Sequence, residues 1–496
     1  MQGLNTLSWP YLRTTSSMTT ITQGAQPMPQ ITFHGAAGTV TGSAHLLQID
    51  NKRILLDCGQ FQGPWEVEQR NYEHLPCNPK TLHAMILSHG HLDHCGRIPL
   101  LSKGGFKGPI YSTPPTRDIA RLILLDSAHV LKEEFQWKRR KLTRMGITAR
   151  EPLYSIEDVY YSMDAFNHQM GYNQTVKLGT TPEIRLTLRD AGHILGSSQV
   201  YLEYENEHGK PQTILYTGDL GDGGRPLMSD PAEPVQPVHT MIMETTYGNR
   251  DHKTYSDTVA EFEDAVTFAM KKRGTALIPA FALERTQEVL YHIGEMKRNG
   301  RLSKKIPVFL NSPLAIDITR IYHTHSEFCC IKLREALQKR QSPFVFPGLI
   351  LTETVEESMA IHSVEGPKIV IAGSGMMNGG RIKHHLKHLL WKESTSLIVV
   401  GYQAEGTLGR KIIEGAKEVQ IFGEPVAVKA KINTINGFSA HAGQSTLLNM
   451  ARKASPKRLF LVHGEPEVSK TFAEKVRKIL PQTEIILPAA GETYKF

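Results

Sequence analysis

The sequence predicts an α/β protein in which a second, Rossmann-like α/β domain is inserted into the first. Three observations support this. Up to residue 248, short apolar strands end in polar residues. Strands and helices then alternate regularly as far as residue 429, and after that the pattern of strands ending in polar residues returns. We therefore expect a first domain made of residues 31–248 and 430–496, with the inserted domain at residues 249–429.

The composition is that of an ordinary globular protein. A chain of 496 residues exceeds what one core usually supports, and its hydrophobic content of 40% is typical. Five cysteines, an odd number without regular spacing, argue against a disulfide framework and favour the reducing cytoplasm. No apolar run approaches the roughly 20 residues that span a bilayer, so no membrane partner is expected. The net charge of +8 is compatible with a nucleic-acid partner.

Residues 1–30 contain no acidic side chain, a single arginine (Arg13), and many Ser, Thr and Gln residues. They lack the several arginines of an amphipathic presequence and the apolar centre of a secretory signal. We expect a disordered tail.

Residues 40–49 and 53–56 predict two strands that meet at a turn, and the second strand ends at Asp57. Residues 84–87 predict a further strand, buried on both faces, which leads into a stretch rich in histidine. In that stretch His89 and His91 are two residues apart, so an extended backbone places them on the same face. Asp93 and His94 are adjacent, so they point differently and suit a second ion. This stretch therefore predicts metal binding.

Several other polar residues follow short apolar strands in the same way. These residues are Asp57, His193, Asp219 and Glu244. Each alone is compatible with a turn or a loop hydrogen bond. Because strand ends of one direction meet at one rim of a sheet, their coincidence with the histidine stretch favours one composite site.

The inserted domain shows regular strand–helix alternation. Ser256 predicts a helix cap, residues 275–278, 306–310, 368–372 and 396–400 predict strands, and residues 284–296 and 381–391 predict helices. A glycine-rich turn at residues 373–381 joins a strand to a helix, where backbone amides can cradle a phosphate. Residues 115–145 of the first domain predict another helix, whose basic run at residues 138–141 is either a solvated face or an RNA contact.

After residue 430 a histidine again follows directly on a predicted strand. Residues 458–462 predict the strand, and His463 follows it. Upstream, residues 438–441 form a second polar motif that ends in His441. The inserted domain therefore interrupts a first domain that closes only near the C-terminus.

Together these motifs resemble the β-CASP nucleases of the metallo-β-lactamase superfamily. The stretch at residues 88–96 resembles the HxHxDH signature, and Asp57, His193 and Asp219 stand at other motif positions. Glu244, residues 438–441 and residues 462–465 resemble the three additional β-CASP motifs, and the likeness begins near residue 31. Glu284 and Asn311 depart from the pattern, where glycine and aspartate are common.

The resemblance implies an αββα metallo-β-lactamase sandwich with the β-CASP domain as the other wall of an RNA cleft. It implies two metal sites that Asp219 bridges. The ligands of the first site would be His89, His91 and His193. The ligands of the second site would be Asp93, His94 and His463. Imidazole and carboxylate ligands suit zinc, with manganese as the alternative.

The resemblance also assigns roles around the metals. Two ions about 3.5–4 Å apart can generate a hydroxide and clamp both sides of an in-line attack on phosphorus. His441 would protonate the leaving oxygen, Glu244 would hold its ring, and Asp57 would orient ligands. Substrate phosphates would meet four residues of the inserted domain: Ser312, Ser374, Arg381 and Arg410.

Three functions are compatible with these motifs. The first is a metal-dependent ribonuclease acting as an endonuclease, a 5′-exonuclease or both. The second is a small-molecule metallo-hydrolase, which does not need the inserted domain. The third is a catalytically inactive scaffold of an RNA-processing complex, which would lack ligands that are present here. DNA-acting relatives lack the histidine found here as His463, so RNA is favoured, and the partner is left open between a homodimer and an RNA-processing complex.

Overall fold

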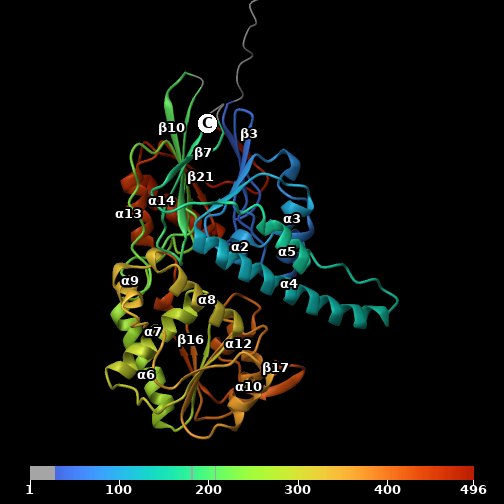
Figure 1. Cartoon of the computed structure of the whole chain (residues 1–496), viewed down its shortest axis with the longest axis vertical. Helices are drawn as coiled ribbons and strands as arrows, with labels where there is room; N and C mark the ends of the chain where they lie inside the picture. The colour runs from blue at the N-terminus through green and yellow to red at the C-terminus, as the bar shows by residue number, and fades with distance from the viewer. Residues whose placement is uncertain (1–27, 180–182, 207) are drawn as a thin grey trace, which may run out of the picture.

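The computed structural model describes residues 28–179, 183–206 and 208–496, and Figure 1 shows their arrangement. Most of the tail expected over residues 1–30 therefore lies outside the described residues. Within the described ranges, no helix combines the length and the apolar character needed to cross a membrane.

Two seven-stranded sheets form the first domain. The first sheet contains, in spatial order, β22 (Thr493–Lys495), β1 (Gln30–Phe33), β2 (His45–Ile49), β3 (Lys52–Leu56), β4 (Ala84–Ile86), β5 (Ile110–Ser112) and β6 (His168–Gln169). The second sheet contains β21 (Glu484–Ile486), β20 (Arg458–Val462), β11 (Thr240–Glu244), β10 (Pro211–Tyr216), β9 (Ser198–Glu205), β8 (Arg185–Asp190) and β7 (Thr175–Lys177). Because β22 pairs with β1 and β20 pairs with β11, both sheets need the C-terminal part of the chain.

The two sheets pack face to face, and helices cover their outer faces (Figure 1). Phe33 from the first sheet and Leu186 and Phe460 from the second share one buried core. The helices over the first sheet are α2 (Leu92–Cys95), α3 (Ile98–Lys103), α4 (Pro114–Thr143) and α5 (Ile156–Met163). The helices over the second sheet are α13 (Gln444–Ala454) and α14 (Pro466–Ile479). This arrangement confirms the αββα sandwich.

A parallel six-stranded sheet forms the inserted domain. Its strands are, in spatial order, β14 (Leu349–Leu351), β13 (Val308–Asn311), β15 (Lys368–Ala372), β12 (Thr275–Pro279), β16 (Ser396–Val399) and β19 (Lys431–Thr434). Alternate strand residues enter two different cores, so both faces of the sheet are covered. The first core includes α6 (Tyr255–Lys271), α7 (Arg285–Arg298), α8 (Pro313–Thr324) and α9 (Ile331–Gln338). The second includes α11 (Ile382–Leu389), α12 (Leu408–Ile413) and the hairpin of β17 (Glu418–Ile421) and β18 (Glu424–Ala427). The Rossmann-like insertion is thereby confirmed.

One strand lies beyond the boundary that we expected at residue 429. β19 pairs in parallel with β16, from Ser396 opposite Lys431 to Val399 opposite Thr434. It therefore completes the inserted sheet, and the chain returns to the first domain only after this strand.

Helix α4 runs from the junction of the two domains out of the molecule (Figure 1). It begins after Thr113, whose side-chain oxygen accepts a hydrogen bond from the backbone N–H of Thr116. Asp118 of this helix pairs with His325 of the inserted domain at 2.8 Å. The basic run at residues 138–141 is exposed on the far part of the helix.

Candidate metal centre

The three histidines expected at the first metal site converge with Asp219. His89 follows β4 and is fully buried, while His91 immediately precedes α2. The Nδ1 atom of His91 lies 3.1 Å from Nε2 of His89 and 3.2 Å from Nε2 of His193. Asp219 Oδ2 lies 3.4 Å from Nε2 of His89. The four ligand atoms come from the ends of strands in both sheets, and all of them lie within 4.8 Å of one another.

The second group lies on the other side of Asp219. Nε2 of His463 lies 3.3 Å from Nε2 of His94 and 3.4 Å from Asp93 Oδ2. Asp219 Oδ1 lies 3.3 Å from Nε2 of His94, so the two oxygens of one carboxylate face the two groups. His463 has a positive φ of 49° just after β20, and its ring meets that of His94 in α2.

The chemistry of this donor set fits divalent cations. Asp219 Oδ1 is buried and accepts no hydrogen bond within the described residues. Burial lowers the pKa of His91 to about 3, and burial also lowers the pKa of His89. Both rings are therefore neutral near pH 7, which is the form that binds a metal. An unsatisfied buried carboxylate oxygen is costly unless a positive charge lies beside it. Nε2 of His94 lies 3.3 Å from this oxygen, and although burial lowers it, the carboxylates of Asp219 and Asp57 raise the pKa of His94 well above its usual range, so a positive charge is favoured at this position.

Asp57 orients these ligands from behind. Its Oδ1 atom accepts from the backbone N–H of Ser88 at 2.7 Å. Its Oδ2 atom accepts from the hydroxyls of Ser88 at 2.7 Å and Tyr216 at 2.6 Å, and from Nδ1 of His94 at 2.7 Å. Because Nδ1 of His94 is engaged, its Nε2 atom points to the second group. Ser88 and Tyr216 were not among the site residues expected from the sequence, since a serine before the motif and a tyrosine in a strand carry no chemical signature.

His441 and Glu244 form a third group with Asp219. Nδ1 of His441 lies 3.3 Å from Glu244 Oε1 and 3.8 Å from Asp219 Oδ2. Glu244 is held in place because it also accepts from the backbone N–H groups of Leu220 at 2.7 Å and Thr246 at 3.2 Å. Although burial lowers it, the carboxylates of Glu244 and Asp219 raise the pKa of His441 to about 9. The His441 side chain is 22% exposed, so its ring is accessible from one side.

Of the four residues expected to contact phosphates, Ser312, Ser374 and Arg381 lie on two loops that follow strands of the inserted sheet, and Arg410 lies in α12. Ser312 caps α8 by accepting from the backbone N–H of Ala315, and the Ser374 hydroxyl donates to the Gly379 carbonyl at 3.3 Å. Arg410 pairs with Glu414 at 2.6 Å.

Arg381 is engaged within the inserted domain. Its guanidinium donates to Asn311 Oδ1 at 2.7 Å, to the Thr352 carbonyl at 2.9 Å and to the Glu353 carbonyl. The asparagine that stands at 311 in place of the common aspartate also donates to His385 at 2.8 Å. These contacts make Arg381 a bridge between two loops.

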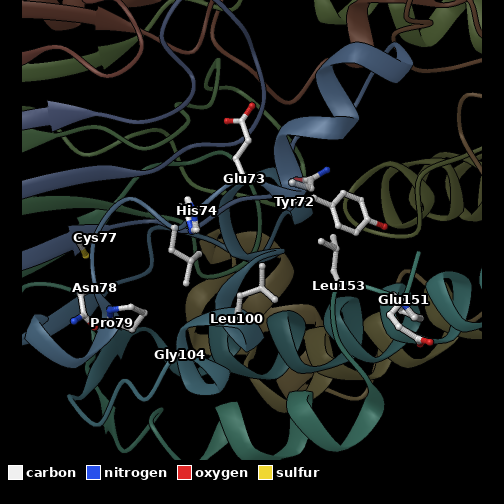
Figure 2. A pocket seen from close by; sticks show the side chains of 13 residues that line it. Tyr72, Glu73, His74, Cys77, Asn78, Pro79, Leu100, Gly104, Glu151 and Leu153 are labelled. Carbon is white, nitrogen blue, oxygen red and sulfur yellow. The ribbon is translucent and has the colours of Figure 1, made fainter. Parts of the chain in front are cut away.

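A pocket of about 610 Å³ opens elsewhere in the first domain. Figure 2 shows Tyr72, Leu100 and Leu153 around it. None of the residues that line this pocket belongs to the metal groups, so it is separate from the candidate site.

Three family descriptions match successive parts of the chain. A metallo-beta-lactamase superfamily domain matches residues 46–219, and a Beta-Casp domain matches residues 286–412. A Zn-dependent metallo-hydrolase RNA specificity domain matches residues 425–488. These matches confirm the resemblance inferred from the motifs.

Several relatives align over most of the chain. Ribonuclease TTHA0252 of Thermus thermophilus is 37% identical, and the alignment covers 92% of this chain and 98% of that protein. The RNase J-like protein of Methanocaldococcus jannaschii is 31% identical, with 91% of this chain and 96% of that protein covered. Transcription termination factor FttA of the same organism is 30% identical, with 91% of this chain and 69% of that protein covered.

A crystal structure of a protein of unknown function from Enterococcus faecalis V583 resembles this fold. It superposes with a TM-score of 0.52 at 14% identity and covers 95% of this chain and 100% of that chain. This likeness supports the fold alone.

Proposed function

Because this chain belongs to the β-CASP family of the metallo-β-lactamase superfamily, we propose that it is a metal-dependent ribonuclease that hydrolyses phosphodiester bonds of RNA. Relatives named as ribonuclease and RNase J-like protein align over nearly their whole length, which supports the same substrate class here. The match to an RNA specificity domain adds to this support.

The convergence of six ligand side chains around Asp219, the seventh, is the observation that carries the proposal. In the first group, the ligands are His89, His91 and His193; in the second, they are Asp93, His94 and His463. We infer two ions, because each oxygen of Asp219 faces a different group. We infer zinc, with manganese as the alternative, because the ligands are imidazoles and carboxylates without thiolate.

Two such ions, when bound, supply Lewis-acid activation of water and neutralise charge on the reacting phosphate. The protein's own contribution is orientation and a proton. Asp57 fixes the ring of His94, and Glu244 fixes the ring of His441 through Nδ1. Since Nδ1 of His441 is engaged by a carboxylate, its Nε2–H is the atom available to protonate the leaving oxygen. Although burial lowers it, the Glu244 carboxylate raises the pKa of His441, which favours the protonated ring at neutral pH.

The two other functions fit less well. A scaffold subunit has no use for a complete ligand set, and all seven positions are filled here. A small-molecule hydrolase needs no second domain, whereas this chain has an inserted domain with its own six-stranded sheet beside the first domain (Figure 1). The cytoplasmic location stays a prediction that rests on the cysteine content.

End-labelled RNA tests the activity and its mode together. The purified protein, loaded with Zn²⁺ or Mn²⁺, is incubated with RNA that carries a 5′-phosphate, a 5′-triphosphate or a 5′-hydroxyl. We expect metal-dependent cleavage that a chelator abolishes. Mononucleotide products identify a 5′-exonuclease and internal fragments an endonuclease. If no RNA is cleaved with any of these metals while both ions are bound, the ribonuclease proposal is wrong.

A further inference from the structure

Two exposed aromatic side chains lie at the rim of the inserted sheet. Phe281 follows β12 and is 37% exposed, and Tyr402 follows β16 and is 49% exposed. β12 and β16 are neighbours in the parallel sheet, so both rings belong to the rim formed by the carboxyl ends of the strands. That rim is where open α/β sheets bind their ligands.

The Phe281 ring rests directly on two loops. A Cβ atom at Gly375 would lie 2.6 Å from the ring, and one at Gly401 would lie 2.9 Å from it. Gln403 holds the two loops together, because its Nε2 atom donates to the carbonyls of Gly375 and Gly401 at 3.0 Å each. A larger residue at either glycine would push the ring away. One side of the Phe281 ring therefore packs on the loops that carry Gly375 and Gly401, while another part of the ring is open to solvent.

Tyr402 lies within electrostatic reach of side chains of the first domain near the proposed proton donor. Burial first, and then the nearby Glu465 and Tyr247, raise the pKa of Tyr402. The ring of Tyr247 in turn lies 6.3 Å from the ring of His441. Both Arg250 and Arg410 also lie close enough to Tyr402 to act on its charge in the opposite direction. Exposed rings flanked by cations are the surroundings that unpaired bases and their phosphates require.

We propose that Phe281 and Tyr402 are stacking platforms for two bases of a single-stranded RNA that passes the metal centre, an inference that rests on the proposed function. The rings supply flat apolar faces, and the supporting glycines fix the position of Phe281. Stacking accepts every base, so these two residues seat the strand without selecting a sequence. Arg250 and Arg410 neutralise the backbone phosphates on either side.

Abasic substitutions test the proposal. Affinity of the metal-free full chain is measured for a short single-stranded RNA and for copies in which one base at a time is removed. We expect Phe281→Ala and Tyr402→Ala each to raise Kd roughly 5- to 150-fold on the intact RNA, the usual effect of losing one base–aromatic stack. On the RNA that lacks the base stacked by that ring, the same substitution should change Kd by less than about twofold, because the partner is already gone.

Two variants separate stacking from other effects. Tyr402→Phe keeps the ring and should bind like the parent protein. Phe422→Ala removes a ring that is also 49% exposed in the same domain, but lies between β17 and β18, and it should leave Kd unchanged. The proposal is overturned if the alanine variants leave Kd unchanged, or if they weaken binding equally on intact RNA and on every abasic RNA. If the stacking proposal is overturned but the parent protein still cleaves RNA, the proposed ribonuclease function stands. If the parent protein neither binds nor cleaves RNA, the ribonuclease function and the stacking proposal are both wrong.

Discussion

At the scale of single residues, His441 and His463 lie close together but have different expected roles. His441→Ala removes only the proposed proton donor, so we expect both metals and RNA affinity to be retained while the rate falls about 10²–10⁴-fold. His463→Ala removes a ligand of the second group, so one ion should be lost. Elemental analysis and single-turnover rates measure the two effects separately.

A substrate whose leaving oxygen is replaced by sulfur is the matched control. Sulfur leaves readily without a proton, so the parent protein and His441→Ala should cleave it almost equally when a thiophilic metal is bound. If His441→Ala loses metal, or remains equally impaired on the sulfur substrate, the proton-donor role is wrong.

Glu284 gives a pH dependence of stability that is separate from the metals. It is buried, accepts a hydrogen bond from the Tyr322 hydroxyl, and burial raises its pKa to about 7. Because the folded pKa lies above the model-peptide value of about 4.3, the folded chain binds the proton more tightly. Stability is then greatest below the unfolded pKa and falls as pH rises through about 7, by roughly 3 kcal/mol.

Glu284→Gln removes this ionisation while keeping a polar side chain of the same size. The drop in thermal midpoint between pH 5 and pH 9 should therefore be smaller in the variant than in the parent protein, measured by circular dichroism on metal-free samples. An equal drop in both proteins would show that Glu284 does not ionise over this range.

The candidate metal ligands were predictable from the sequence because all seven stand in one short motif or just after an apolar strand. What surrounds them was less predictable. Tyr216 donates to Asp57 from across the sandwich, at a sequence separation of 159 residues, and only the packing of the two sheets brings them together. The engaged state of Arg381 was missed for the same reason, since its partners at Thr352 and Glu353 lie on a different loop.

At the scale of elements, the glycine-rich turn before α11 depends on Arg381. Three protein acceptors already hold this guanidinium, so we now expect it to stabilise the turn rather than to contact phosphate. Arg381→Ala should lower the thermal midpoint and leave the salt dependence of RNA binding unchanged. Arg410→Ala is the comparison, because within the described residues the Arg410 guanidinium pairs with the exposed Glu414. This substitution should reduce the slope of log K for RNA binding against log salt concentration by about 0.7.

If Arg381→Ala flattens the salt dependence without lowering the midpoint, the side chain leaves its partners and contacts phosphate as first expected. Fluorescence anisotropy at several salt concentrations, beside thermal unfolding of the same samples, distinguishes the two roles.

Periodicity identified the elements better than it identified their limits. The helix expected over residues 115–145 is found as α4, Pro114–Thr143. The strand expected over residues 40–49 begins only at His45. Gly42 has a φ of 75°, outside the range of a strand, and a Cβ atom there would lie 2.4 Å from the Phe61 ring. β19 belongs to the inserted sheet because its partner is β16, and no local signal in residues 431–434 distinguishes one sheet from the other.

At the scale of the whole molecule, the metal groups join segments that are far apart in the chain. Asp93 and His94 come from the first segment of the first domain, Asp219 lies more than 120 residues later, and His463 follows the inserted domain. Ions bound here therefore connect both sheets and the C-terminal return of the chain. The inserted domain supplies none of the ligands in these groups among the described residues.

Metal binding should consequently stabilise the first domain more than the inserted one. Close to two zinc-type ions should bind per chain, and free metal at 100 times its Kd stabilises the bound state by about 2.7 kcal/mol per site. On chelation, hydrogen exchange should accelerate in β11 and β20 and change little in β12 and β15. His463→Ala should show a smaller metal-induced gain in thermal midpoint than the parent protein, because one site is lost, whereas His441→Ala should keep the full gain. Equal acceleration in both domains would mean that they unfold as one unit, and no acceleration would mean that the ligand groups do not hold metal in the folded chain.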